Sequence, residues 1–259
     1  MNDSLRLSLR AALAASSSAA LFSALQVDKL VRPLEGTKDD ERKDPYVQAW
    51  ARALLRILGV ERVDVTHGAG VAEGGRVVVA RGGRVVVANH RSTLDILIML
   101  DLFGGHLLAR GDMAGWPVMG KLAREAGTLF VDRQDPASGA GAVQRVRSRL
   151  RAGRTITVFP EGTTFLDDEV RAFHPGAFVA AAREKVPVLP VGIAYENVDA
   201  CFGDEPIGAH GKRLFTARRT RVAVAIGEAI PSRGHSLNAL RDQAHEQVQS
   251  LVRRARAAL

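Results

Sequence analysis

Aromatic residues and cysteine are scarce in this chain of 259 residues. Phe, Trp and Tyr make up 5% of it, which leaves few rings for stacking on the bases of single-stranded nucleic acid. Cys201 is the lone cysteine, so an internal disulfide is excluded, and a role as a buried small hydrophobic residue is favoured over a nucleophilic one. No motif typical of nucleic-acid binding is present. We therefore expect no nucleic acid among the partners.

Long apolar runs are also missing, since no stretch reaches the ~20 consecutive apolar residues that a membrane-spanning helix needs. The nearest approach is residues 11–25, which are rich in Ala and Ser and interrupted by Ser16 to Ser18. Asp3 precedes this stretch and no clear cleavage site follows it, which argues against a secretory signal. Two interpretations stay open: a helix that lies on a membrane, and a helix packed on the protein's own core.

Positive charge is in excess, because 36 Lys and Arg stand against 28 Asp and Glu and give a formal net charge of +8. Such an excess attracts polyanions, which include nucleic acids, anionic lipid surfaces and phosphorylated substrates. A dense charged run at residues 36–44 predicts a linker. We therefore expect residues 1–43 to form an N-terminal helical segment with its linker, and residues 44–259 to form the main domain.

Short β-branched runs alternate with longer helical patterns along the main domain. The run Arg84–Ala88 predicts a buried strand. Further strands are expected at 128–131, 155–159, 188–193 and 221–226. Helices are expected at 45–58, 93–103, 139–152 and 237–259. This alternation predicts an α/β fold with a mainly parallel central sheet flanked by helices.

Polar side chains follow three of the predicted strands, at the edge where ligands of open α/β sheets gather. The three segments are Asn89–Asp95, Asp132-Arg133 and Phe159–Thr164. A base, cations and a carboxylate should therefore meet at one edge of the sheet. The run Val186–Val191 carries no titratable group, so Pro190 is expected to shape the pocket wall, as is Pro160 in the third segment.

His90 and Asp95 are the candidate catalytic pair. Histidine suits proton transfer near neutral pH, and a carboxylate fixes its tautomer and stabilises the imidazolium. If His90 lies in the turn and Asp95 in the first turn of the next helix, the chain can bring them together. Ser92-Thr93-Leu94-Asp95 also fits a capping box, so Asp95 as a helix-start residue stays open, and both roles can hold at once. No second histidine stands at helical spacing, so we expect no metal.

Arg133 is a candidate for phosphate binding, because a guanidinium donates forked hydrogen bonds to phosphate. A surface ion pair with Asp132 is the alternative. Arg91 is a second candidate of the same kind.

The turn at Glu161 should expose both its backbone and its side chain. Gly162 would let a ligand approach closely, and Thr163 or Thr164 could cap the next helix and leave N–H groups for an anion. An ordinary loop capped by threonine is the alternative.

Four segments in order resemble the glycerolipid acyltransferase family, and specifically the lysophosphatidic acid acyltransferases. They are Asn89–Asp95 with the pattern N-H-x-x-x-x-D, Gly127–Arg133 after Trp116–Gly120, Phe159–Thr164 followed by Phe173–Ala177, and Val186–Val191. A lone His-x-x-x-x-Asp is a weak signal. All four segments in family order and at family-like spacing are a strong one.

The resemblance implies an O-acyltransferase that moves a fatty acyl group from acyl-CoA or acyl carrier protein to the hydroxyl of a lysophospholipid, converting lysophosphatidic acid to phosphatidic acid. It implies that His90 is the general base and that Asp95 orients it. It implies that Arg133 binds the acceptor phosphate and that Glu161 and Gly162 hold its glycerol portion. No cofactor beyond the acyl donor is implied. The further substrate-binding candidates are Asn89, Arg91 and Thr163.

Two alternatives stay open: an acyltransferase for a different lysolipid, such as lyso-ornithine lipid, whose head group lacks phosphate, and a non-catalytic lipid-binding relative. Donor and acceptor both carry long apolar tails, and the positive charge suits an anionic membrane surface. Many members of the family have clear transmembrane helices, which this sequence lacks. We therefore expect peripheral or interfacial attachment at the cytoplasmic face of the cell membrane.

Overall fold

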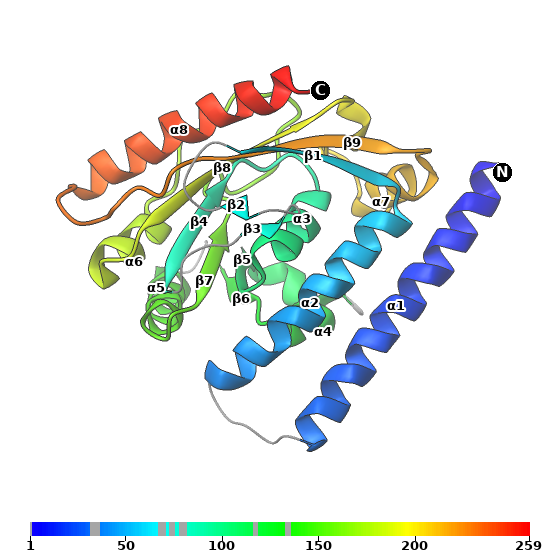
Figure 1. Cartoon of the computed structure of the whole chain (residues 1–259), viewed down its shortest axis with the longest axis horizontal. Helices are drawn as coiled ribbons and strands as arrows, with labels where there is room; N and C mark the ends of the chain where they lie inside the picture. Colours follow the sequence, from blue (N-terminus) through cyan, green and yellow to red (C-terminus); the bar gives the residue numbers. More distant parts are fainter. Residues whose placement is uncertain are drawn as a thin grey trace.

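Helices cover both faces of a mostly parallel sheet in the computed structural model of the chain (Figure 1). The structure describes residues 2–31, 37–66, 71–72, 76–77, 82–115, 119–132 and 136–259. Within these ranges, seven strands form one sheet in the order β1-β9-β8-β4-β7-β5-β6. Its neighbouring strands run parallel, except for the antiparallel pair β8 and β9. The predicted fold class is confirmed.

Strands and helices alternate along most of the chain. The strands of the large sheet are β1 (Val60–Thr66), β4 (Arg84–Ala88), β5 (His106–Arg110), β6 (Leu129–Val131), β7 (Thr155–Val158), β8 (Val188–Tyr195) and β9 (Thr220–Ile226). A small antiparallel pair consists of β2 (Val71–Ala72) and β3 (Arg76–Val77). The helices are α1 (Asp3–Val31), α2 (Thr37–Ile57), α3 (Leu94–Phe103), α4 (Met119–Glu125), α5 (Pro136–Arg151), α6 (Gly176–Glu184), α7 (Ile207–Thr216) and α8 (Leu237–Ala257). Short 3-10 turns are η1 (Gly111–Gly115) and η2 (Val198–Ala200).

The sheet divides the core in two, because successive side chains of a strand point to opposite faces. On β4, Val86 and Ala88 pack with α2, α3 and α7, whereas Val85 and Val87 pack with α5, α6 and α8. All four are fully buried. A strand that is buried on both faces needs a continuous apolar run, and the run Val85–Ala88 is the pattern from which β4 was predicted.

The charged run before the main domain is part of a helix, so the predicted linker is wrong for residues 37–43. α2 begins at Thr37, and Lys, Glu and Arg are good helix formers. Arg42 forms an ion pair with Asp28 of α1 at 3.1 Å. α2 ends at Ile57, one residue before the predicted end of this helix, and Gly59 just beyond it has a φ of +71°, which suits glycine.

α1 is a 29-residue helix, longer than the apolar stretch at residues 11–25 from which a helix was predicted. It runs beside α2 along the outer side of the molecule (Figure 1). One side of it packs on the body, where Leu21 and Leu25 join the core shared by α2 and the sheet. Among the described helices, α1 alone is long and apolar enough to cross a membrane, a test that a signal sequence also passes.

Polar contacts hold α1 to the body at both ends and in the middle. Near its start, Arg10 donates hydrogen bonds to carbonyl oxygens at the end of α7, with Nη1 2.5 Å from the oxygen of Ala217. In the middle, the indole of Trp50 donates to the hydroxyl of Ser18 at 3.1 Å. Near its end, Lys29 pairs with Glu125 of α4 at 2.7 Å. The helix is therefore fixed lengthwise on the body.

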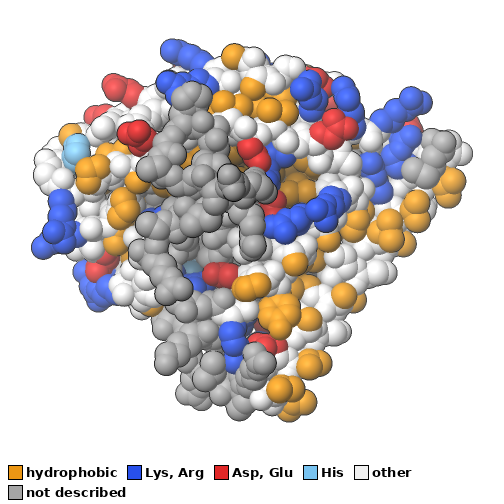
Figure 2. Space-filling model, viewed as in Figure 1, with side chains coloured by type: hydrophobic (Ala, Val, Ile, Leu, Met, Phe, Trp, Pro, Cys, Tyr) orange, Lys and Arg blue, Asp and Glu red, His pale blue; other side chains and the backbone are white. Residues whose placement is uncertain are grey.

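The outward face of α1 is uncharged and largely apolar. Every exposed residue from Ser4 to Val31 is uncharged. Figure 2 shows hydrophobic side chains along the edge of the molecule that α1 forms. The large ones among them, which are 46% to 82% exposed, are Leu5, Leu9, Leu13, Val27, Leu30 and Val31. Such a face on a helix that is also docked on the core is consistent with membrane association.

Candidate active site

Asn89 ties the end of β4 to its neighbour β8. Its side-chain amide donates to the carbonyl oxygen of Ile193 at 2.9 Å, and its amide oxygen accepts from the N–H of Ile193 at 2.8 Å. The side chain is fully buried. Both polar groups of Asn89 thus bond to the backbone of Ile193, and the expected contact with a substrate is not supported. Asn89 instead fixes the point at which the chain leaves the sheet toward His90.

His90 and Asp95 lie side by side, as predicted. The chain turns after Asn89 and α3 begins at Leu94, which places Asp95 in its first turn. Nδ1 of His90 is 2.8 Å from Oδ2 of Asp95. The same oxygen accepts the backbone N–H groups of Arg91 at 2.6 Å and Ser92 at 2.8 Å. Asp95 thus also satisfies N–H groups just before the helix, so its geometry suits both interpretations left open by the sequence.

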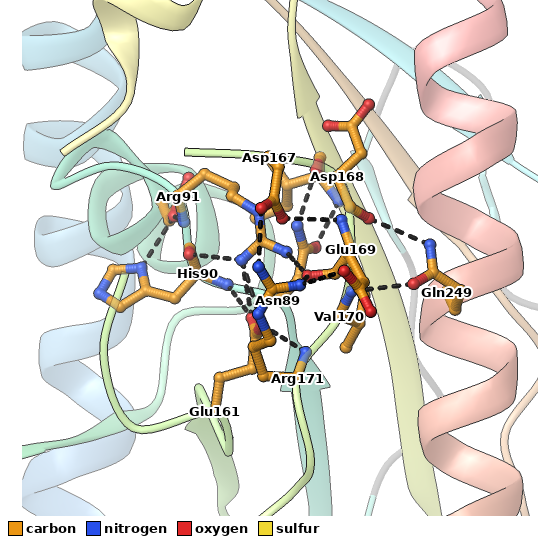
Figure 3. Close-up of polar contacts among 12 residues, drawn as sticks. Asn89, His90, Arg91, Glu161, Asp167, Asp168, Glu169, Val170, Arg171 and Gln249 are labelled. Atoms are coloured by element: carbon orange, nitrogen blue, oxygen red, sulfur yellow. Dashed lines mark hydrogen bonds and ion pairs between the residues drawn. The ribbon is translucent and has the colours of Figure 1, made fainter. Parts of the chain in front are cut away.

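The imidazole of His90 is held in one orientation. Its ring stacks on that of Phe159 with centroids 4.1 Å apart and planes inclined by 12°. A carboxylate at Nδ1 favours the tautomer with the proton on that nitrogen, which leaves a lone pair on Nε2. Figure 3 shows the second ring nitrogen directed away from the polar network. The arrangement can therefore accept a proton at Nε2 while Asp95 stabilises the resulting imidazolium.

Glu161 and Arg91 form a buried ion pair behind His90 (Figure 3). Oε1 of Glu161 accepts from the backbone N–H of His90 at 2.8 Å and from Nη1 of Arg91 at 2.9 Å. Oε2 accepts from the N–H of Arg171 at 2.9 Å. Arg91 also donates to the carbonyl oxygens of His90 and Glu169.

The side chains of this pair are 0% and 2% exposed. The expected direct contacts of Glu161 and Arg91 with a substrate are therefore not what the geometry supports. Both carboxylate oxygens and the guanidinium are engaged within the protein, where they fix the backbone of His90.

The loop after Glu161 differs from the predicted threonine-capped helix start. α6 begins only at Gly176, so neither Thr163 nor Thr164 caps it. Gly162 is half-buried with a φ of +87°, which suits glycine, and Thr163 is exposed beside it. These two positions are open to a ligand.

The two prolines expected to shape a pocket are both buried. Pro160 directly precedes Glu161, and its carbonyl oxygen accepts from the N–H of His174 at 2.9 Å. Pro190 lies within β8 opposite Val87 of β4.

Arg133 lies outside the described residues. The strand before it, β6, is not a direct neighbour of β7, because β5 lies between them. β5 was not predicted. The polar segments that follow β4 and β7 therefore meet directly, whereas the one that follows β6 starts two strands away from β7 in the sheet.

Tyr195 at the end of β8 belongs to the candidate site but was not predicted from the sequence. Its hydroxyl donates to Oδ1 of Asp95 at 2.6 Å. Burial, and secondly the nearby charge of Asp95, raise the pKa of Tyr195 well above its ordinary value, so the hydroxyl keeps its proton. The available signal was its place at the end of the strand beside β4, four residues past Val191.

Cys201 is buried, as predicted. Burial, and secondly the charge of Asp95, raise the pKa of its thiol to about 12, which leaves no thiolate to act as a nucleophile near neutral pH. Among the described residues, no group of three His, Cys, Asp or Glu side chains is placed to hold a metal ion.

Comparison with known proteins gives a match of residues 71–194 to the sequence profile of a family described as Acyltransferase. The chain is similar to the lyso-ornithine lipid O-acyltransferase of Pseudomonas aeruginosa, with 36% identity over 169 residues that cover 62% of this chain and 64% of that protein. It is similar to the 1-acyl-sn-glycerol-3-phosphate acyltransferase BAT2 of Brassica napus, with 32% identity over 125 residues, 48% of this chain and 36% of that one. The chain thus spans less than two thirds of the length of these curated relatives.

A solved structure shares the fold over nearly the whole chain. The crystal structure of the 1-acyl-sn-glycerophosphate acyltransferase from Thermotoga maritima matches 96% of this chain and 98% of its own, with a TM-score of 0.61 and 22% identity.

Proposed function

Because this chain belongs to the acyltransferase family, we propose that it is a lysolipid O-acyltransferase with His90 as general base. The observation that carries this proposal is the contact of His90 with Asp95 at 2.8 Å, inside the segment that matches the family. It leaves one imidazole nitrogen for the substrate. A non-catalytic lipid-binding relative would have no need of this buried carboxylate and aligned imidazole.

In the proposed reaction, the lysolipid hydroxyl attacks the carbonyl carbon of an acyl thioester while Nε2 of His90 takes its proton. The C–O bond forms, and the tetrahedral intermediate then collapses by breaking the C–S bond. The thiolate leaves and takes up the proton that His90 had accepted. No covalent enzyme intermediate and no cofactor are required, and the donor is acyl-CoA or acyl carrier protein. General-base help of this kind is typically worth about 10²–10⁴ in rate.

We assign Arg91 and Glu161 to positioning and Gly162 and Thr163 to substrate contact. The buried pair holds the backbone N–H and carbonyl of His90, so it keeps the imidazole in place. Gly162 and Thr163 follow it on the accessible part of the loop. Arg133 remains the proposed partner of an anionic group on the acceptor.

For the acceptor, we propose a lyso-ornithine lipid first and lysophosphatidic acid second. The relative from Pseudomonas aeruginosa, whose name states the former activity, shares 36% identity over 62% of this chain, whereas the Brassica napus relative named for the latter shares 32% over 48%. This order reverses the one implied by the resemblance of the sequence to lysophosphatidic acid acyltransferases. Both acceptors are lysolipids with a free hydroxyl, so the chemistry at His90 is the same.

We further propose that α1 lies on the cytoplasmic face of a membrane. Its uncharged outward face would enter the lipid interface, while its contacts with α7, α2 and α4 keep it on the body. A helix docked lengthwise in this way is suited to lying in the interface, where the lysolipid acceptor resides.

An acyl-transfer assay on the purified full chain tests the function. It pairs acyl-CoA and acyl carrier protein donors with lyso-ornithine lipid, lysophosphatidic acid and lysophosphatidylcholine, each in vesicles. We expect transfer to lyso-ornithine lipid above the others, and loss of about 10²-fold or more in His90→Ala. Transfer to lysophosphatidic acid alone would make lysophosphatidic acid the acceptor and reject lyso-ornithine lipid. Equal activity of His90→Ala and the native chain would reject the mechanism.

A further inference from the structure

The two carboxylate oxygens of Asp95 accept hydrogen bonds from different parts of the fold. Oδ2 contacts Nδ1 of His90 and accepts two backbone N–H groups, all from the turn that precedes α3. Oδ1 accepts from the hydroxyl of Tyr195, which lies at the end of β8. Tyr195 is therefore the contact that joins the catalytic carboxylate to the sheet.

The contact is fully withdrawn from water, since the side chain of Asp95 is 0% exposed and Tyr195 is 2% exposed. A buried carboxylate oxygen without a donor costs its full desolvation. Hydrogen bonds to a charged acceptor are also stronger in such surroundings. Within the described part of the chain, the hydroxyl of Tyr195 donates the hydrogen bond that Oδ1 accepts.

Tyr195 is itself held in register with His90. Two residues before it, Ile193 exchanges two hydrogen bonds with Asn89, the residue that precedes His90. The distance between the end of β4 and the hydroxyl of Tyr195 is thus fixed by the sheet. With Oδ1 anchored, the carboxylate cannot rotate away from the imidazole.

We infer that Tyr195 is a positioning residue of the His90–Asp95 pair, one that both holds the carboxylate and draws off part of its negative charge. This inference rests on the proposed function. A donor on Oδ1 weakens the pull of Asp95 on the Nδ1 proton, so Tyr195 sets how readily His90 gives up a proton it has accepted.

The other titratable and charged groups that face the pair have a fixed charge state or partners of their own. Arg91 and Glu161 neutralise each other. His210 of α7 bonds to Thr93 at 3.0 Å, and burial first, with Arg213 second, lowers its pKa. Cys201 keeps its proton. A change in the pH profile on altering Tyr195 can therefore be traced to the pair.

The chain has two tyrosines, so Tyr195→Phe has a matched control in Tyr46→Phe, which removes a hydroxyl from an exposed site on α2. We expect Tyr195→Phe to lower kcat about 10- to 100-fold, the typical worth of a hydrogen bond to a charged group, with KM for the lysolipid within about twofold. The acid limb of the kcat/KM profile should move to higher pH, because Asp95 then holds the imidazolium more tightly. Tyr46→Phe should match the native chain in kcat, in KM and in the pH profile.

A second measurement serves where Tyr195→Phe fails to fold. In the Tyr46→Phe background, 3-fluorotyrosine enters at Tyr195 alone. Its more acidic hydroxyl donates more strongly, so the acid limb should move to lower pH, opposite to the phenylalanine variant. An acid limb that stays in place with 3-fluorotyrosine would overturn the inference.

A double-mutant cycle tests whether Tyr195 acts through Asp95. In an Asp95→Asn background, Tyr195→Phe should change kcat less than about twofold. The same loss in both backgrounds would show that Tyr195 acts elsewhere and would overturn the inference.

A spectroscopic readout separates failure of this inference from failure of the proposed function. The downfield Nδ1–H proton resonance of His90, identified by its absence in His90→Ala, should shift in Tyr195→Phe and not in Tyr46→Phe. This holds whether or not any lysolipid is acylated. An unchanged resonance would overturn the inference, and a shifted one without turnover on any acceptor would reject only the function.

Discussion

At the scale of single residues, Glu161 joins three backbone segments through one buried carboxylate. Its oxygens accept from His90 and Arg171, and its charge balances that of Arg91. Glu161→Gln would leave the Arg91 guanidinium buried without a counter-charge. We expect a loss of about 3–5 kcal/mol in the free energy of unfolding, measured by urea denaturation, together with reduced kcat.

The control for this change is Glu196→Gln, which breaks an exposed pair with Arg221 and should cost at most about 1 kcal/mol. Equal stability of the two variants would contradict the role given to the buried pair.

Asp95→Asn should reduce acyl transfer by about 10²–10⁴ with little change in KM, because an amide neither fixes the tautomer of His90 nor stabilises its protonated form. Steady-state kinetics at saturating donor measure this. Asp204→Asn, at an exposed loop position, should leave the kinetics unaltered. A comparable loss in both would point to a general effect on folding.

The contact between His90 and Asp95 could be predicted from sequence because the two residues are close along the chain and follow a recognisable buried strand. Contacts between distant residues could not. Nothing local to Glu161 indicates that its carboxylate is buried against Arg91 seventy positions earlier. Tyr195 meets Asp95 from a strand a hundred positions later, so no spacing could reveal it.

At the scale of elements, the outward face of α1 is the feature with the clearest test. The double change Leu9→Glu and Leu13→Glu places two charges on the uncharged face and should lower sedimentation with anionic vesicles severalfold, because charges resist entry into the interface.

Ser250→Glu with Ala257→Glu is the matched control, since it adds the same charge at exposed positions of α8 on the other side of the sheet. Binding reduced equally by both pairs would assign the effect to net charge and not to α1.

Most strands and helices of the main domain were predictable, because β4 and its neighbours are uniform apolar runs and α8 has a clear helical period. β5 was not. Its run His106–Arg110 is short and begins and ends on a basic side chain, which masks the strand pattern. Because β5 separates β7 from β6, missing it also misplaced the Arg133 segment within the sheet. The charged start of α2 was not predicted because it has no apolar period from which a helix could be recognised.

At the scale of the whole molecule, the net charge of +8 should make membrane binding depend on salt. Each Lys or Arg near an anionic surface contributes roughly 1 kcal/mol, and this attraction is screened at about 8 Å in physiological salt. We expect binding to anionic vesicles to weaken as salt rises from 50 to 500 mM and then to level off at the share supplied by α1. Continued loss to zero binding would mean that charge alone holds the protein to lipid.

The buried thiol of Cys201 gives a probe of global opening. With its pKa raised to about 12 by burial, the thiol of the folded chain should resist a disulfide reagent at pH 8 and react fully in denaturant. The thiol loses its proton at a lower pH in the unfolded chain than in the folded chain. The free energy of unfolding should therefore fall as pH rises from about 9 toward 12. Rapid labelling of the native chain at pH 8 would contradict this.

The pairing of β1 with β9 brings Val60 beside Thr220, so the sheet closes only after β9 has left the ribosome. α1, by contrast, is synthesised before every strand of this sheet. A nascent chain therefore exposes the uncharged face of α1 long before the strand that completes the sheet exists, and contact of this helix with a bilayer can precede folding during translation.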